Sequence, residues 1–288
     1  MELEIRTATA ADWPIVQPFF RRNFREGHPF RNRAFWEWHV RDPDASLSVI
    51  VVSEGSVVAH RAVNFGGGCQ WGMMLYVEPS HRGQRIVSQL LAQTAHLAEH
   101  ASTNANRLME SIYRRRRWHR SADLVRSVAV RPGLSPRGIV APIDTIELPH
   151  PSGHYWSQPG IRGVKLESGT AVAQLRVGGL RAVDVSDPQG LLEEAWNYGF
   201  RWVDYVTSWN DWLLDEMDPE QWLQEDDSPV PWSLDPIRPG SLARIRVYSE
   251  NPLPVDLVIR RTYSDHGRVG SLPEGEVDQD VPVVPPHS

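Results

Sequence analysis

Apolar positions recur along the first half of the chain with the spacing of short strands and short helices. An alternating run of four residues comes first, and after it come two segments with apolar residues three and four apart, as is typical of amphipathic helices. Glu54-Gly55 then separates two β-rich runs, which predicts a hairpin. The pattern predicts the order strand, helix, helix, three strands, helix, strand, helix, strand, over residues 3–6, 13–24, 33–41, 46–53, 56–64, 71–77, 86–98, 101–104, 106–116 and 125–130.

The passage from the strand that ends at Val77 to the helix that begins near Ile86 carries the strongest local signal. A glycine-bearing loop, His81-Arg82-Gly83-Gln84, joins the two elements. The first N–H groups of a helix have no partner inside the helix, and the helix dipole places positive charge there. Together with the Arg82 guanidinium, these donors predict an anion site suited to phosphate. An ordinary strand–turn–helix unit with a surface arginine would explain the same pattern.

The second half of the chain repeats part of this order after a stretch rich in proline and glycine at residues 131–165. The pattern predicts a hairpin, a helix, a strand, an acidic Trp-rich helix, a short helix and two closing strands, over residues 170–177 and 180–185, 188–198, 201–207, 209–217, 220–223, 243–248 and 257–263. The final residues are rich in Pro, Glu and Asp, as disordered tails are. We therefore expect a domain at residues 1–140, a second at residues 141–270 and a tail at residues 271–288.

The composition is that of a folded globule, with 41% apolar residues and 12 Trp among 288 residues. No run of about 18 uncharged apolar residues occurs and the acidic start is unlike a signal peptide, so we expect no membrane partner and a cytoplasmic location. The single cysteine, Cys69, excludes an intramolecular disulfide and a cysteine-based zinc cluster. Because no His or Asp lies near it in sequence, Cys69 is better interpreted as structural than as a nucleophile.

Charge is divided unequally between the two halves. Residues 1–140 hold 19 Arg and 12 acidic residues, a net charge of +7, whereas residues 141–288 hold 11 basic and 24 acidic residues, a net charge of −13. The basic half would attract a polyanion, either a phosphorylated cofactor or nucleic acid, although the halves could also attract each other. The block Arg114-Arg115-Arg116-Arg117 is either a solvated helix surface or a contact for a phosphate-rich donor.

Three motifs, in this order of elements, resemble the GNAT superfamily of N-acyltransferases. They are the opening strand with Thr7 to Trp13, the segment Val77 to Gln84, and Asn106 followed by Tyr113 and Trp118 seven and twelve residues later. The resemblance covers about residues 1–150. It implies an α/β (α+β) fold with a mixed sheet whose central strands splay apart to admit a pantetheine arm. The second half would be a smaller α/β domain, a degenerate second GNAT unit without a phosphate loop.

The resemblance also implies where an acyl-coenzyme A co-substrate would bind. Residues at the helix start would hold its phosphates, three strand residues would line its pantetheine arm and one asparagine would complete the site: Arg82, Gly83, Gln84, Arg85, Ile86 and Val87, then Leu75, Tyr76 and Val77, and Asn106. The family usually has small residues where this chain has Arg85 and Val87. These side chains would crowd a pyrophosphate, although Arg85 adds charge of its own.

Acyl transfer to an amine requires a deprotonated amine, a held oxyanion and a proton for the leaving group. By the resemblance, Tyr113 would protonate the departing thiolate, and a backbone N–H near residues 75–77 would hold the oxyanion. For the base we choose Glu78, with His81, Glu110 and His119 as other choices, and each could equally be a surface group. The spacing of histidines and carboxylates predicts no metal site.

We therefore predict an N-acyltransferase that moves an acyl group from acyl-coenzyme A, or another pantetheine thioester, to an amine of a small molecule such as an amino sugar or a natural-product intermediate. The segment Phe35 to Pro43 resembles members of the family tied to polysaccharide or secondary metabolism. Two alternatives stay open. Tandem units also resemble the Fem-type transferases, which take an aminoacyl group from tRNA, and the altered loop and the arginine block favour such a donor. The loop substitutions and the missing base would also suit a catalytically inactive binding module.

Overall fold

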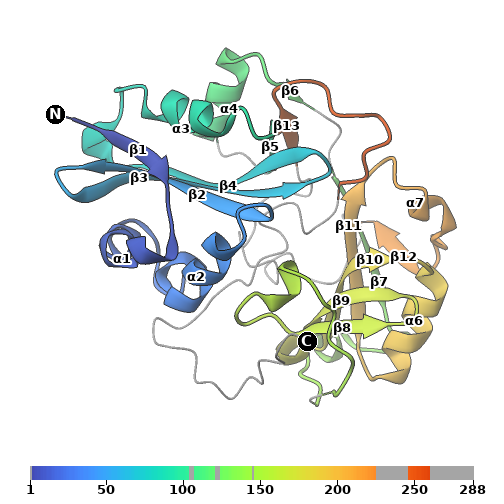
Figure 1. The fold of residues 1–288 in the computed structure, drawn as a ribbon. Coiled ribbons are helices and arrows are strands. Elements are labelled where there is room, and N and C mark those ends of the chain that lie inside the picture. Colours follow the sequence, from blue (N-terminus) through green and yellow to red (C-terminus); the bar gives the residue numbers. More distant parts are fainter. Residues whose placement is uncertain (1, 104–106, 121–123, 145, 225–245, 260–288) are drawn as a thin grey trace.

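The structure is a computed structural model that describes residues 2–103, 107–120, 124–144, 146–224 and 246–259. Two mixed sheets, each with helices packed on it, lie next to each other (Figure 1). The predicted α/β class is confirmed. Among the described residues, no helix has both the length and the apolar character needed to span a membrane.

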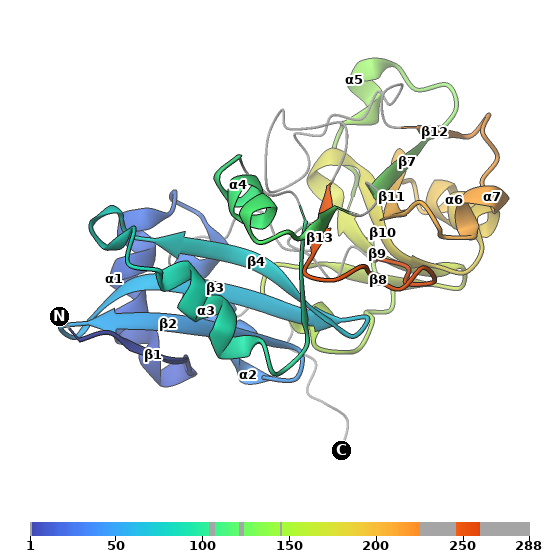
Figure 2. The ribbon, with the colours of Figure 1, turned by 90° about the horizontal axis from the view of Figure 1, so that it is seen from above.

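The first sheet has seven strands in the described part of the chain, and β4 is the central one. Helices α1 (Trp13–Asn23) and α2 (Arg33–Arg41) cover one face, and α3 (Ile86–Thr94) and α4 (Arg107–Arg115) cover the other (Figure 2). The strands in spatial order are β1 (Glu4–Thr7), β2 (Ser46–Ser53), β3 (Ser56–Gly66), β4 (Cys69–Val77), β5 (Glu99–Thr103), β13 (Val247–Ser249) and β6 (His119–Arg120).

An aromatic core holds α1 and α2 against the sheet. The rings of Phe20, Phe30 and Trp36 are fully buried, and Phe20 lies 5.3 Å from Phe30 and 5.6 Å from Trp36 between ring centroids. Buried aromatic rings in tilted contact contribute more than their area alone. This face of β3 and β4 is therefore held firmly. A second, aliphatic cluster lies under α3 and includes Val49, Val51, Ile86 and Leu90.

The second sheet has six strands in the described part of the chain, and α6 (Pro188–Asn197) packs on it. Short helices α5 (Pro136–Ile139) and α7 (Leu213–Glu216) lie beside it. The strands in spatial order are β12 (Trp222–Gln224), β7 (Leu124–Val130), β11 (Trp202–Ser208), β10 (Gly179–Val185), β9 (Gly169–Gln174) and β8 (Gly163–Leu166). Single 3₁₀ turns lie at Ala10–Asp12, Pro29–Arg31, Pro79–His81, Tyr155–Ser157 and Leu175–Val177.

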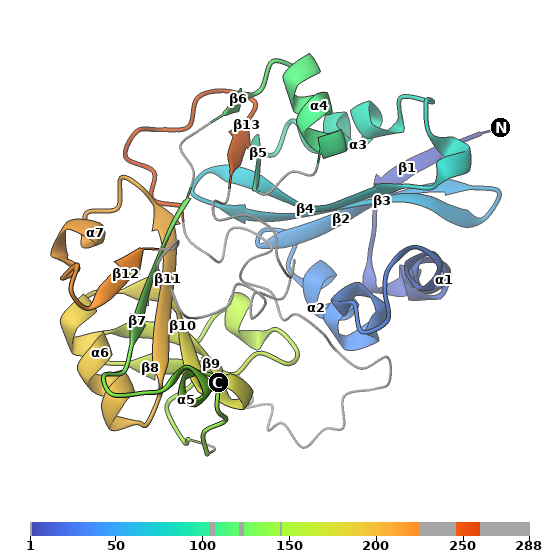
Figure 3. The same ribbon diagram turned by 180° about the vertical axis from the view of Figure 1, so that it is seen from behind.

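Two strands cross between the sheets. The strand expected at residues 125–130 forms as β7, but it pairs with β11 of the second sheet rather than joining the first. Its place beside β5 is taken by β13, which the chain reaches more than 100 residues later (Figure 3). An apolar cluster that includes Trp71, Ala101, Leu124 and Val206 packs the two sheets together. The division of the chain at residue 140 stays a prediction, and the strand exchange shows that the two halves fold around each other.

Several predicted elements differ in the structure. The helix expected at residues 209–217 is only α7, because the Asp211 carboxylate accepts hydrogen bonds from Tyr205 Oη, Thr207 Oγ1 and the Leu213 amide and so fixes a turn before it. The helix expected at residues 220–223 is wrong, because residues 222–224 pair with the edge of β7 as β12. Helix α3 ends at Thr94, earlier than expected. Residues 257–259 form no strand, and residues 260–263, with the predicted tail, lie outside the described residues.

Candidate functional site

The parallel strands β4 and β5 pair over only part of their length. They are in register from Cys69 opposite Glu99 to Gly72 opposite Ser102, and β4 then continues to Val77 with β3 as its only strand partner among the described residues. The register between β3 and β4 shifts at this point and leaves Met73 as an extra, bulged residue. A bulge bends a strand and increases its twist, which explains why β4 turns away from β5 here. The predicted splay of the central strands is confirmed.

The separated half of β4 is less buried than its paired half. Gln70 and Trp71 are fully buried, whereas Met74, Leu75 and Tyr76 are partly exposed although they lie in the central strand. Leu75 belongs to the face under α3, and Met74 and Tyr76 belong to the face under α1 and α2. A strand edge without a neighbour presents backbone donors and acceptors, so this edge can pair with an extended ligand.

The loop from β4 to α3 forms a left-handed turn with Arg85 at a position that favours glycine. Gly83 has φ +84°, and Arg85, just before the helix, has φ +61° and ψ +16°. Since Ile86 begins the helix, Arg85 and Ile86 form a left-handed and right-handed pair, which directs successive N–H groups toward one point. These amides and the first turn of α3 make the geometry of an anion-binding turn.

The exposed side chains of this loop include two arginines. Arg82, Gln84 and Arg85 are exposed, while Ile86 is buried and Val87 packs against the aliphatic cluster under α3. Arg82 Nε donates to the Val77 carbonyl at 3.1 Å, and its guanidinium carbon lies 5.7 Å from the centroid of the Tyr76 ring. Arg82 is thus held beside the separated half of β4.

Tyr113 lies in a stack of rings at the end of α4. Its ring is parallel to that of Trp118 at 4.3 Å, and the Tyr248 ring lies 5.4 Å away on a tilt of 36°. The helix ends at a left-handed residue, Arg117 with φ +59°, and the Trp118 amide donates back to the Tyr113 carbonyl at 2.9 Å. This helix ending brings together two rings five residues apart in sequence, as helix C-caps of this kind do. Tyr113 is only 5% exposed.

A buried polar cluster lies behind the separated edge, and sequence reasoning missed it. Arg61 on β3, opposite Leu75, is 3% exposed and donates to Thr94 Oγ1 and to Gln70 Oε1. Burial lowers the pKa of the Arg61 guanidinium to about 10, against the raising effects of Tyr113 and Glu250. The guanidinium therefore stays charged at neutral pH. A single Arg within an apolar strand was the signal that could have revealed this cluster.

His100 completes this cluster from β5. It is 2% exposed, its Nε2 lies 3.4 Å from Thr94 Oγ1, and its Nδ1 lies 3.6 Å from the Glu250 carboxylate. Burial, with the nearby positive charge of Arg61 and Arg116, lowers the pKa of His100 to about 3. His100 is therefore neutral at physiological pH.

The side chains considered as bases are engaged in structural contacts. Glu78, just after β4, accepts from Arg22 Nη2 at 2.9 Å and Asn23 Nδ2 at 3.1 Å, both from the end of α1. Glu110 accepts from Arg246 and Tyr248, and hydrogen bonds with these two residues lower the pKa of its carboxyl group. His81 contacts Ser80 Oγ at 2.9 Å, and His119 is exposed on β6.

Two other residues singled out in the sequence are Asn106 and Cys69. Asn106 lies outside the described residues. Cys69 is buried, and burial raises the pKa of its thiol, which agrees with a structural role rather than with a reactive thiolate. Within the described residues, no three His, Cys, Asp or Glu side chains come together as a metal site would require.

The first sheet and its helices match a known protein family. Residues 13–115 match the family model described as Acetyltransferase (GNAT) family, and they span α1 to α4. The matched residues include the separated half of β4, the turn before α3 and Tyr113. None of the curated proteins matches the chain.

Two solved structures share most of the fold. A GCN5-related N-acetyltransferase from Kribbella flavida is 15% identical, with a TM-score of 0.51 over 85% of this chain and 71% of that one. A putative acetyltransferase from Pyrococcus horikoshii is 14% identical, with a TM-score of 0.50 over 89% and 92%. At these identities the likeness concerns the fold alone, and it extends over both sheets.

Proposed function

Because residues 13–115 match the GNAT acetyltransferase family model, we propose that this protein moves an acyl group from acyl-coenzyme A to an amine of a small molecule. The observation that carries the proposal is the free edge of β4 over residues 73–77, which leads directly into the left-handed turn before α3. An extended thioester arm can pair with the edge while its phosphates lie against the turn.

The turn would hold the phosphates of the donor. The amides at Gly83 to Val87 supply hydrogen-bond donors, and the start of α3 supplies the positive end of the dipole. Arg82 and Arg85 add two exposed guanidinium groups, which suit phosphate because their donors are arranged as a fork. The replacement of glycine by Arg85 thus keeps the backbone turn and adds a charge to it.

The free edge of β4 would hold the pantetheine arm and the thioester. Backbone groups of Leu75, Tyr76 and Val77 are available to the arm, because β5 has already separated from them. An N–H on this edge would donate to the thioester carbonyl and stabilise the oxyanion that forms there. In the transfer step the amine nitrogen bonds to the carbonyl carbon, the carbon–sulfur bond breaks, and the electron pair leaves with sulfur.

Tyr113 would return a proton to that thiolate. Its ring is fixed between Trp118 and Tyr248, and the buried Arg61 guanidinium interacts favourably with it. Glu78 remains the proposed base. Since its carboxylate already accepts from Arg22 and Asn23, it would act on the amine through a water molecule.

The acceptor would enter on the face of α1 and α2. Tyr76 and Phe24 are partly exposed there, 5.8 Å apart between ring centroids, and the fully buried Phe19 packs behind Tyr76 at 6.0 Å. An aromatic wall binds an ammonium group or a ring well. This favours a small amine such as an amino sugar or a natural-product intermediate.

Steady-state assays would test the proposal by following thiol release from acetyl-coenzyme A with a panel of amines. We expect amine-dependent thiol release, and we expect Arg82→Ala to raise KM for the donor by about tenfold through the loss of one charge-assisted phosphate contact. Arg131→Ala, an exposed arginine after β7, is the matched control and should leave KM unchanged. Absence of thiol release with every amine and acyl group would refute the proposal.

Aminoacyl-tRNA is the second candidate donor, and one observation favours it. Arg114, Arg115, Arg116 and Arg117 are all exposed at the end of α4. Contacts between arginines and a phosphate backbone release counterions, so tRNA binding should weaken steeply with salt. Strong salt-dependent binding of charged tRNA, with no binding of coenzyme A, would favour this donor over the thioester.

A further inference from the structure

β13 brings the second half of the chain against the helix that carries Tyr113. It pairs antiparallel with β5, Val247 opposite Thr103 and Ser249 opposite Ala101, and its other edge pairs with β6 (Figure 3). Farther along, the Ile259 amide donates to Ser208 Oγ at 2.9 Å, at the end of β11. The segment is therefore anchored in the first sheet and on the second.

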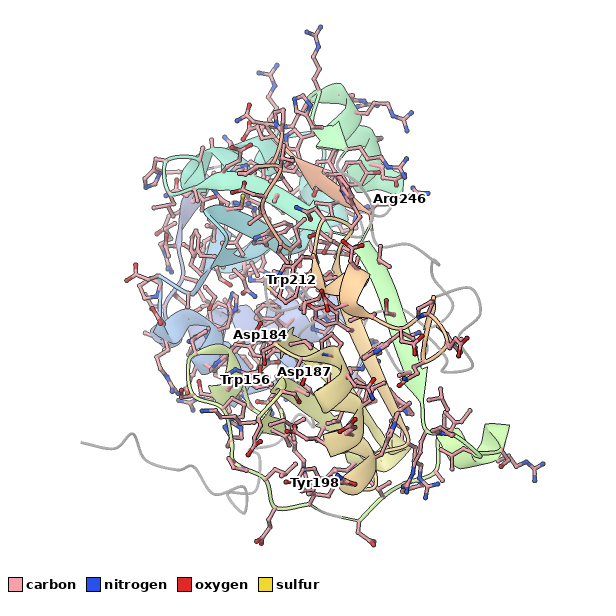
Figure 4. The ribbon with its side chains drawn as sticks, turned by 90° about the vertical axis from the view of Figure 1, so that its right-hand side faces the viewer. Trp156, Asp184, Asp187, Tyr198, Trp212 and Arg246 are labelled. Atoms are coloured by element: carbon pink, nitrogen blue, oxygen red, sulfur yellow. The ribbon has the colours of Figure 1, made fainter. Side chains whose placement is uncertain are left out.

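Two side chains of this segment, Arg246 and Tyr248, bind Glu110 on α4, and we call these contacts the clamp. Arg246 and Tyr248 both donate to Glu110 Oε1, the latter at 3.0 Å, and Arg246 lies next to α4 in Figure 4. These hydrogen bonds lower the pKa of the Glu110 carboxyl group and keep it charged. Glu110 is thus better suited to anchor the helix than to accept a proton.

The clamp lies one helical turn from the proposed acid. Glu110 and Tyr113 are three residues apart, so their side chains are neighbours on one face of α4. The Tyr248 ring also lies 5.4 Å from the Tyr113 ring, on which Trp118 stacks. Two contacts from β13 therefore bear on the orientation of Tyr113, one through Glu110 and one through the ring itself.

We propose that Tyr248 and Arg246 are positioning residues for Tyr113, so that the second half of the chain completes the active site of the first. The inference rests on the function proposed above. A general acid is effective only when its geometry is held within a fraction of an ångström by neighbours that are themselves fixed. The strand exchange between the sheets supplies such a support.

Kinetics of single variants would test the inference. We expect Tyr248→Phe, which keeps the ring, and Arg246→Gln to lower kcat by about threefold each while KM for the thioester stays within about twofold, because only the alignment of the acid changes. Arg246→Lys should restore part of the loss. Glu37→Gln, which breaks the Arg33–Glu37 pair of 2.7 Å on α2, is the matched control and should leave kcat unchanged.

A double-mutant cycle separates positioning from general stability. If Tyr248 acts through Tyr113, Tyr248→Phe should have no further effect on kcat in a Tyr113→Phe background. Equal losses in both backgrounds, or an unchanged kcat in Tyr248→Phe alone, would overturn the inference and leave the proposed function intact. A normal kcat in Tyr113→Phe would instead remove the proposed acid, and the inference with it.

Discussion

The strand–turn–helix unit of the first sheet has a counterpart in the second, and the two differ at the point where a phosphate would bind. In both sheets one parallel pair, β4–β5 and β10–β11, stops pairing at a bulge. Met73 is the bulged residue in β4 and Val183 is the bulged residue in β10. In both, the first strand of the pair is followed by a helix, α3 or α6.

The segment between the bulge and the helix differs between the two units. β4 leads into a long loop with exposed Arg82 and Arg85, whereas β10 leads almost directly into α6. The N-cap of α6 is Asp187, whose Oδ1 accepts from the Gly190 amide at 3.0 Å, and Asp184 lies close to it (Figure 4). The Asp187 carboxylate thus binds one backbone N–H at the start of α6, whereas no side chain in the described part of the chain caps the start of α3. The strand–helix arrangement thus offers an anion site between β4 and α3 and has a capped helix start between β10 and α6.

Two buried arginines, Arg126 in the second sheet and Arg61 in the first, differ in the charge of their partners. Arg126 of β7 is paired with the Asp204 carboxylate at 3.1 Å, and both side chains are almost fully buried. The hydrogen bonds described for Arg61 of β3 go instead to neutral groups, Gln70 and Thr94. Arg126 thus has a carboxylate as its partner, whereas the Gln70 and Thr94 partners of Arg61 carry no charge.

Removal of the Tyr113 hydroxyl should have the largest effect on activity. We expect Tyr113→Phe to lower kcat by about tenfold or more, because the thiolate would leave without a placed proton donor. Stability should change little, since the phenyl ring keeps its stack with Trp118. Tyr198→Phe, at an exposed tyrosine of the second unit, is the control for kcat and for thermal unfolding. A kcat equal to that of the unaltered chain would remove the assigned role.

Burial of His100, together with the nearby positive charge of Arg61 and Arg116, should make the stability of the protein sensitive to acid. Its pKa in the folded state, about 3, lies below its value in the unfolded chain, so the unfolded state binds the proton first. The stability that neutral His100 contributes is complete above about pH 6.5 and falls with pH by at most about 1.4 kcal/mol per unit. Urea unfolding of the native chain and His100→Gln at pH 7, 6 and 5 should show a flatter profile in the variant. Parallel profiles would contradict the assignment, and the exposed His119→Gln is the control.

Arg85→Gly should separate the cost of the left-handed backbone at this position from the contribution of the guanidinium to coenzyme A binding. A residue with a side chain costs about 1 kcal/mol in the left-handed region, so the glycine variant should be more stable by about that amount while it binds coenzyme A about fivefold more weakly. Glu54→Gly is a matched control, because Glu54 has φ +50° in the β2–β3 turn. It should gain similar stability with unchanged affinity for coenzyme A. Equal affinities in the two variants would refute a phosphate contact by Arg85.

The counterpart variant in the second unit should affect stability alone. Asp187→Ala removes the cap of α6 and should lower the free energy of unfolding by about 1 kcal/mol. Binding of coenzyme A, followed by calorimetry, should not change. A second binding event in this variant would mean that the capping carboxylate alone had kept a phosphate site closed.

Local patterns in the sequence predicted much of the first unit. The Glu54-Gly55 hairpin and the passage from β4 to α3 depend on neighbours within a few residues, whereas the resemblance singled out Tyr113 and Trp118. The left-handed Arg85 was not expected, because without glycine only the surrounding structure can enforce that conformation.

Long-range pairing explains most of the failures. β13 has only three residues, and its partners Ala101 to Thr103 lie more than 100 residues away, so no local pattern indicates where it pairs. The pattern at residues 220–223 predicts a helix, but residues 222–224 form strand β12 because an edge of β7 is available for pairing. Tertiary context overrides intrinsic preference in short elements of this kind.

Calorimetric titration of the full chain with coenzyme A tests the central claim most directly. We expect one molecule bound per chain, about tenfold weaker binding in Arg82→Ala, and unchanged binding in Asp187→Ala, since the turn before α3 presents donors and positive charge while the start of α6 is capped. Two molecules per chain, or an affinity that Arg82→Ala leaves unchanged while Asp187→Ala alters it, would contradict the claim that the phosphate site belongs to the first unit alone.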